Sequence, residues 1–164
     1  MKLVCDLHIH SKYARATSPR ADLETLAKWA GIKGVNVLGT GDFTHPLWFK
    51  EIPQKLEPAE EGLYVLRQTT NDKRLTTRFL LSVEVSLIYK KGDKVRKIHQ
   101  LIMVPSLREA DEIRKHLAKV GNIDSDGRPI FGLSSEKLAE LVFGVSEKAM
   151  LIPAHCWTPW FAIF

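Results

Sequence analysis

The sequence predicts an α/β fold whose strands form a barrel-like arrangement instead of a doubly wound sheet. Residues 1–38 follow the order strand, helix, strand, which is typical of a parallel βαβ unit. About six strand segments in all are separated by helical segments, which places the chain in the α/β class. A doubly wound sheet would carry a glycine-rich phosphate loop after its first strand. The residues there are His10, Ser11, Lys12 and Tyr13.

The first three elements follow from alternation and capping residues. Residues 1–10 alternate between apolar and polar side chains, which predicts a strand with Cys5 on its apolar, core-facing side. Asp22 is suited to cap a helix that continues to about Gly31. Residues 35–38 then begin the second strand.

The remaining elements are predicted from the same kinds of signal. A helix begins at Pro46 and is interrupted by Pro53 and Pro58. The other expected elements are a strand over 63–66, strands over 78–89 and 95–104 joined by a hairpin turn at 90–94, a helix over 107–120, a polar loop over 121–132, a helix from the Ser134 cap to Phe143, and a strand over 150–155.

Length and composition predict a single domain with its own core. The 164 residues are 45% hydrophobic and 26% charged, and the net charge of +5 permits an anionic partner without demonstrating one. Asp6, His8 and His10 interrupt the only apolar stretch near the start, so we expect neither a secretion signal nor contact with a membrane. The sequence therefore predicts a protein of the cytoplasm.

Imidazoles and carboxylates lie at or near the ends of several predicted strands. In barrels of parallel strands, active sites are built at the carboxyl ends. A lone strand histidine is more often an ordinary hydrogen-bonded residue, and Glu84 alone could face water on an edge strand. Together the set is harder to explain by chance, because buried charge is costly without a partner or a metal. The candidate ligands are His8, His10, Asp42, His45, Glu84, His99 and His155.

This donor set indicates more than one divalent ion. Imidazole and carboxylate ligands together suit zinc, manganese or iron better than calcium. The set exceeds one tetrahedral shell, and Glu84 is a natural bridge because it has two oxygens. Paired ions are typical of phosphoester hydrolysis, in which one activates water and the other stabilises the leaving oxygen.

Residues 6–11 (DLHIHS) resemble the opening motif of the PHP (polymerase and histidinol phosphatase) superfamily. The superfamily's later motifs follow in order at Asp42, Glu84, His99 and the pair Ala154-His155. More narrowly, residues 6–18, 39–46 and 154–160 resemble the endonuclease Q family of PHP enzymes, which nick DNA on the 5′ side of deaminated bases and abasic sites.

The resemblance implies a distorted (β/α)7 TIM-like barrel that binds two or three divalent ions, with zinc preferred and manganese or magnesium as alternatives. It implies His8 and His10 on one ion, His99 and His155 on a second, and Glu84 between them. Asp42, expected with Glu84 to act in catalysis, would serve a third ion with His45. Here the pattern departs from the superfamily, in which a histidine directly follows this aspartate.

The resemblance also implies that residues 1–164 are the N-terminal part of a single PHP domain. A complete barrel of this kind takes roughly 250 residues, and the superfamily's closing Asp-x-His motif is absent. We therefore expect a barrel that is incomplete at its C-terminal end, and an isolated fragment without catalytic activity.

Basic and aromatic residues near the predicted rim fit a DNA substrate. Basic side chains would contact backbone phosphates, and aromatic rings would stack against an extruded base. Lysines of the 90–97 hairpin have a simpler explanation, because lysine at exposed turns prevents aggregation. The expected DNA-binding residues are Lys12, Tyr13, Arg15, Arg20, Trp157 and Trp160.

Three functions follow from these observations. The leading prediction is a divalent-metal-dependent phosphodiesterase that nicks damaged DNA during repair. A small-molecule phosphatase of the same superfamily would share the metal ligands. A non-catalytic PHP-like module would bind no metal.

Overall fold

The structure is a computed structural model that describes residues 2–15, 17–67 and 77–164. Four helices and eight strands lie within these ranges. In chain order they are β1 (Cys5–Asp6), α1 (Leu23–Lys33), β2 (Val37–Gly39), α2 (Pro46–Lys55), β3 (Leu56–Pro58), β4 (Tyr64–Leu66), β5 (Arg78–Lys91), β6 (Lys94–Val104), α3 (Leu107–Ala118), β7 (Ile130–Phe131), α4 (Ser135–Val145) and β8 (Met150–Pro153).

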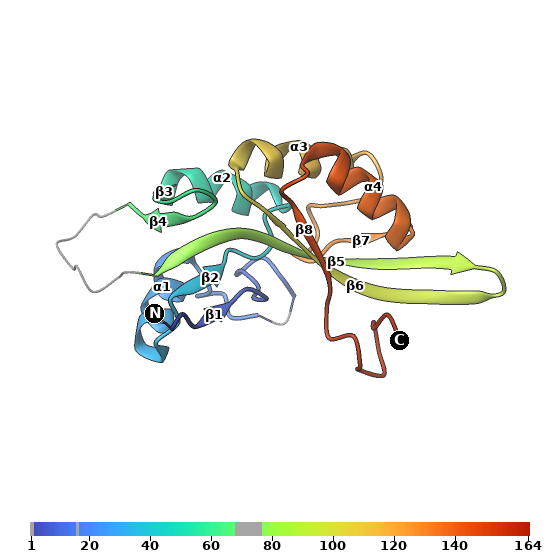
Figure 1. Ribbon diagram of the computed structural model, residues 1–164, viewed down its shortest axis with the longest axis horizontal. Helices are drawn as coiled ribbons and strands as arrows, with labels where there is room; N and C mark the ends of the chain where they lie inside the picture. The colour runs from blue at the N-terminus through green and yellow to red at the C-terminus, as the bar shows by residue number, and fades with distance from the viewer. Residues whose placement is uncertain (1, 16, 68–76) are drawn as a thin grey trace.

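The described strands form one open, mixed sheet. Strands β1, β2 and β5 are parallel neighbours, and β5 also pairs in parallel with β7. The β3–β4, β4–β5, β5–β6 and β6–β8 pairs are antiparallel. The long strand β5 joins both parts of the sheet, as Figure 1 shows. The predicted (β/α)7 barrel is therefore wrong.

Two hairpins explain why the strands do not form such a barrel. Adjacent parallel strands need a long crossover connection, whereas a short turn makes neighbouring strands antiparallel. Strands β5 and β6 are joined by a turn at Gly92 and Asp93, so the predicted hairpin is confirmed. Strands β3 and β4 form a second antiparallel pair. The middle of the chain thus follows strand–turn–strand connections.

The predicted N-terminal βαβ unit is confirmed, although its first strand is short. The Asp22 side chain accepts a hydrogen bond from the Thr25 backbone N–H and caps α1. The helix ends at Gly34, whose φ of 72° is in the left-handed region that glycine adopts readily. Strand β1 has one pairing partner among the described strands, and Cys5 is exposed instead of buried in the core.

Both later helices begin at serine caps, and the predicted cap at Ser134 is confirmed. Ser106 accepts a hydrogen bond from the Glu109 N–H at the start of α3, and Ser134 accepts one from Lys137 at the start of α4. Helix α2 continues through Pro53, where the sequence predicts a break. No helix within the described ranges is long and apolar enough to cross a membrane.

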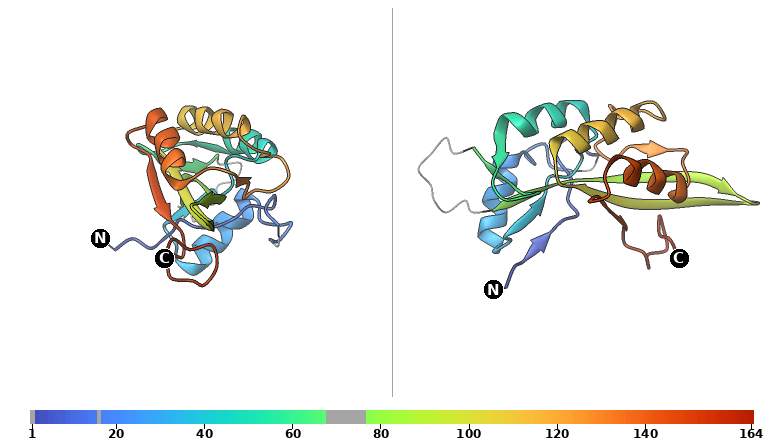
Figure 2. Two further views of the ribbon diagram at one scale, coloured as in Figure 1. Left: turned by 90° about the vertical axis from the view of Figure 1, so that its right-hand side faces the viewer. Right: turned by 45° about the horizontal axis from the view of Figure 1, so that its top comes forward.

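The core lies between the sheet and its covering helices. Helices α2, α3 and α4 lie on one side of the long β5–β6 hairpin, and α1 lies on the other with β1 and β2 (Figures 1 and 2). Along β5, alternate apolar side chains are fully buried, and the intervening buried positions are polar. The apolar set is Phe79, Leu81, Val83, Val85 and Leu87, and the polar set is Ser82, Glu84 and Ser86.

Candidate metal centre

Glu84 lies at the centre of the candidate site because β5 is an interior strand. Its side chain is 1% exposed, so the alternative of a glutamate facing water on an edge strand is excluded. The alternation of β5 places Glu84 on the opposite face from Val83 and Val85, which pack in the apolar core. A buried carboxylate at such a position needs partners of opposite charge or a metal.

Two imidazoles approach Glu84 from the β6–β8 side. His99 lies on β6 directly opposite Ser86, so its side chain shares the polar face of β5. His99 Nδ1 is 3.0 Å and His155 Nε2 is 3.3 Å from Glu84 Oε1. The two nitrogens are themselves 3.2 Å apart. Three donor atoms from β5, β6 and the segment after β8 therefore converge on one small volume.

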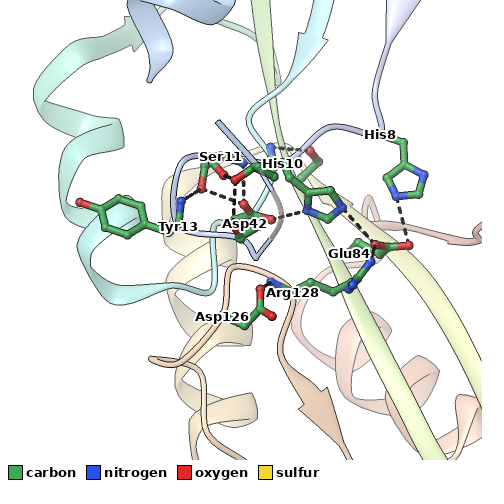
Figure 3. Close-up of polar contacts among 12 residues, drawn as sticks. His8, His10, Ser11, Tyr13, Asp42, Glu84, Asp126 and Arg128 are labelled. Atoms are coloured by element: carbon green, nitrogen blue, oxygen red, sulfur yellow. Dashed lines mark hydrogen bonds and ion pairs between the residues drawn. The ribbon is translucent and has the colours of Figure 1, made fainter. Parts of the chain in front are cut away.

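Two further imidazoles approach from the segment that follows β1. His8 Nε2 is 3.1 Å from Glu84 Oε1, and His10 Nε2 is 3.2 Å from Oε2. Figure 3 shows both rings directed at the Glu84 carboxylate. The His-x-His spacing predicts this shared direction, although the segment itself is not strand.

These residues form two groups of metal-donor atoms that share Glu84. One group is His8, His10 and Glu84, and the other is Glu84, His99 and His155, with the donor atoms of each within 4.8 Å of one another. Donors around one tetrahedral ion with bonds of about 2.1 Å lie roughly 3.4 Å apart. Glu84 Oε1 accepts no well-aligned hydrogen bond from the described residues. The residues therefore fit divalent ions with nitrogen and oxygen ligands.

The surrounding imidazoles keep Glu84 ionised. Burial acts to raise the pKa of Glu84, but polar contacts with His10, His8 and His99 outweigh it and hold the pKa well below its usual range. Burial likewise acts to lower the pKa of His10, but hydrogen bonds and negative charge from Asp42 and Glu84 raise it to about 9. The two carboxylates thus favour a positive charge at the position of the His10 ring.

Asp42 holds His10 from the side away from Glu84. Asp42 is fully buried, and its Oδ1 lies 2.9 Å from His10 Nδ1. Its Oδ2 accepts hydrogen bonds from the Ser11 N–H at 2.6 Å and the Ser11 hydroxyl at 2.7 Å. A carboxylate on the second ring nitrogen fixes the orientation of a ligating histidine. Asp42 thus belongs to neither donor group and positions a member of one.

His45 lies apart from both donor groups. Its ring stacks on Tyr13 with centroids 4.4 Å apart, and its Nε2 is 3.1 Å from the backbone oxygen of Asp124. The ring is buried, and its Nδ1 has no hydrogen-bond partner among the described residues. The expectation that His45 and Asp42 serve a third ion stays a prediction.

The expected DNA-binding residues lie in two different settings. The Lys12 ammonium and the Tyr13 hydroxyl both bind the Glu51 carboxylate on α2, at 2.9 and 2.6 Å. The hydrogen bond to Glu51 raises the pKa of Tyr13 to about 12. The other four expected residues are exposed: Arg15, Arg20, Trp157 and Trp160.

Arg128 and Ser11 contact the site although the sequence analysis assigns them no role. Arg128 Nη1 is 3.3 Å from Glu84 Oε2, and the guanidinium points at the carboxylate in Figure 3. Arg128 lies 44 residues from Glu84 in a loop that looks merely polar in sequence. Ser11 directly follows the His-x-His motif, so its place beside Asp42 could have been anticipated.

Comparison with known proteins finds relatives but no matching family model. An uncharacterized protein of Methanocaldococcus jannaschii is 34% identical over 155 residues, which are 94% of this chain and 16% of that protein.

Two solved structures are also similar to the chain. The lesion-specific endonuclease PfuEndoQ from Pyrococcus furiosus is 31% identical with a TM-score of 0.81, over 98% of this chain and 36% of that one. The second is endonuclease Q in complex with a 27-mer duplex substrate that has an abasic lesion at the active site. It is 32% identical with a TM-score of 0.79, and the match covers 95% of this chain and 35% of that one. The chain thus spans about a third of the solved endonucleases it matches and shares their fold in that part.

Proposed function

We propose that the chain forms the metal centre of a divalent-metal-dependent DNA endonuclease of the PHP superfamily, which nicks DNA on the 5′ side of a deaminated base or an abasic site. The observation that carries the proposal is the Glu84 carboxylate enclosed by four imidazoles, in a chain 31–32% identical to endonuclease Q structures. Zinc is the preferred metal for such a donor set, with manganese or magnesium as alternatives.

Each ligand has a separate task in this proposal. His8 and His10 would hold one ion, His99 and His155 would hold the other, and Glu84 would be shared between them, since its Oε1 faces His8, His99 and His155 and its Oε2 faces His10. Ions in such a pair lower the pKa of water and stabilise negative charge on the leaving oxygen of a phosphodiester. Asp42 keeps the His10 ring turned toward Glu84 through its contact with Nδ1.

A nicking assay tests the proposal. Zinc-loaded full-length protein, in which this chain would form the metal centre, should nick duplexes that contain one uracil, hypoxanthine or abasic site on the 5′ side of the lesion, and should leave the undamaged duplex intact. Glu84→Gln keeps the shape of the side chain but removes the charge that serves both ions. Its activity should therefore fall by more than the roughly 100-fold typical of losing an outer partner of a ligand.

Glu140→Gln is the matched control, because Glu140 is an exposed glutamate on α4. It should nick at the wild-type rate. Zinc-loaded full-length wild-type protein that leaves all three lesions intact would contradict the proposal. Turnover of small phosphomonoesters in its place would indicate a small-molecule phosphatase.

A further inference from the structure

Arg128 and Arg15 both line a small cavity beside the candidate metal centre. The cavity has a volume of about 160 Å³, and its lining includes both arginines and Asp126. This volume is below the roughly 300 Å³ of pockets that hold drug-sized ligands, so an occupant has to be a small group. The cavity lies next to Glu84 because the Arg128 side chain reaches from one to the other.

Asp126 fixes the two arginines relative to each other. Its Oδ1 accepts hydrogen bonds from two backbone N–H groups, that of Arg15 at 3.2 Å and that of Arg128 at 3.1 Å. Its Oδ2 lies 3.6 Å from Arg15 Nε. One carboxylate thus joins the loop after β1 to the loop before β7, and the Arg15 guanidinium lies beside it. The three side chains together carry one excess positive charge.

The loop before β7 is also fixed against the metal centre. The Gly127 N–H donates a hydrogen bond to the Tyr13 carbonyl oxygen at 3.0 Å. A Cβ atom at Gly127 would lie 2.4 Å from Asp42 Oδ2, so only glycine permits this close approach. The backbone next to Arg128 therefore packs directly on the carboxylate that orients His10.

We propose that Arg128, with Arg15, binds a phosphate of the DNA backbone at this cavity and positions the strand against the metal centre. The inference rests on the proposed function, because it supplies the substrate to the same site. Without divalent ions, the Arg128 guanidinium is attracted to the Glu84 carboxylate. When cations share that carboxylate, its negative charge is neutralised, and a phosphate becomes the better partner for a planar, bidentate donor.

This metal dependence separates Arg128 from an ordinary basic surface residue. Each phosphate contact contributes about 0.9 to the slope of log affinity against log salt concentration. In zinc, Arg128→Ala should lower that slope by about 1 and weaken binding roughly tenfold at 0.1 M salt. In a chelator, the same substitution should leave the slope unchanged, because the wild-type guanidinium stays on Glu84.

The probe is a labelled duplex, nicked on the 5′ side of an abasic-site analogue and carrying a phosphate at the nick, so that no cleavage disturbs the titration. Fluorescence anisotropy gives the affinity at several salt concentrations. Lys148→Ala is the control. This lysine is 72% exposed and its side chain pairs with Glu61. It precedes β8, whereas His155 follows the other end of that strand. The variant should keep the wild-type slope in both conditions.

Arg128→Lys separates loss of charge from loss of fold, because it keeps the charge and should keep the wild-type slope in zinc. An equal drop in Arg128→Lys and Arg128→Ala, or no drop in Arg128→Ala, overturns the inference. Full-length wild-type protein that fails to nick lesion DNA but shows the zinc-dependent Arg128 effect refutes the proposed endonuclease and supports the phosphate site. Full-length wild-type protein that nicks lesion DNA, while Arg128→Ala keeps the wild-type salt slope in zinc, supports the endonuclease and refutes the phosphate site.

Discussion

At the scale of single residues, the contact between His10 and Asp42 makes the metal-free protein sensitive to pH. The pKa of His10 is about 9 in the folded chain, against 6.5 for an unperturbed histidine. A raised pKa means that the protonated ring stabilises the fold below pH 6.5 and that this stabilisation is lost as the pH rises to about 9. The free energy of unfolding in a chelator should therefore decrease over this interval.

Urea titrations at several pH values across this interval measure the effect. Asp42→Asn is the informative variant, because it removes one of the two carboxylates that raise the pKa of His10. The decrease in stability with pH should be smaller in this variant. A wild-type free energy of unfolding that increases between pH 6.5 and 9 would show that His10 is not held as a cation.

The sequence predicts the ligands better than the residues that support them. Glu84 is conspicuous as the only charge in an apolar run, and His8 and His10 share a direction because they are two residues apart. Arg128 has no such local signal: its place beside Glu84 depends on how the loop before β7 docks on the loop after β1. Contacts of this kind are set by tertiary packing and leave no periodic pattern in the sequence.

At the scale of elements, the docking of the loop before β7 predicts that substitution at Gly127, in this loop, differs in effect from substitution at Gly132, directly after β7. Gly127→Ala would place a methyl group 2.4 Å from Asp42 Oδ2, whereas a Cβ at Gly132 meets no described atom within 4 Å. Overpacking of this kind costs about 1–3 kcal/mol, and a substitution in open space changes stability by less than about 0.5 kcal/mol.

Gly127→Ala should therefore lower the free energy of unfolding by about 1–3 kcal/mol. It should also weaken zinc binding, since the displaced Asp42 no longer orients His10. Gly132→Ala should match the wild type in denaturant titration and in zinc binding. Equal behaviour of the two alanine variants would mean that the loop does not pack on Asp42.

Element prediction succeeds where a local signal exists. The caps at Asp22 and Ser134 place two helices, and the lysine-rich turn places the β5–β6 hairpin. The first strand is much shorter than its alternation suggests, because alternation records which side chains share a face and not where backbone pairing begins. Pairing with β2 involves Cys5 and Asp6 alone.

At the scale of the whole molecule, the barrel prediction is wrong because only some of the site residues follow the carboxyl ends of strands. Sites at the carboxyl ends of parallel strands are typical of barrels, and His8, His10 and His155 do follow strands. Glu84 and His99, however, lie within β5 and β6, which are antiparallel neighbours. The hairpin that the sequence itself predicts already required this pairing. The expected inactivity of the isolated chain stays a prediction.

The shared role of Glu84 is the central claim, and metal stoichiometry tests it most directly. Protein saturated with zinc, dialysed and analysed by elemental mass spectrometry should contain about two zinc ions per chain. Glu84→Gln should contain less than one, because both donor groups lose the same carboxylate. Wild-type protein without zinc, or a Glu84→Gln variant that retains about two ions, would contradict the account.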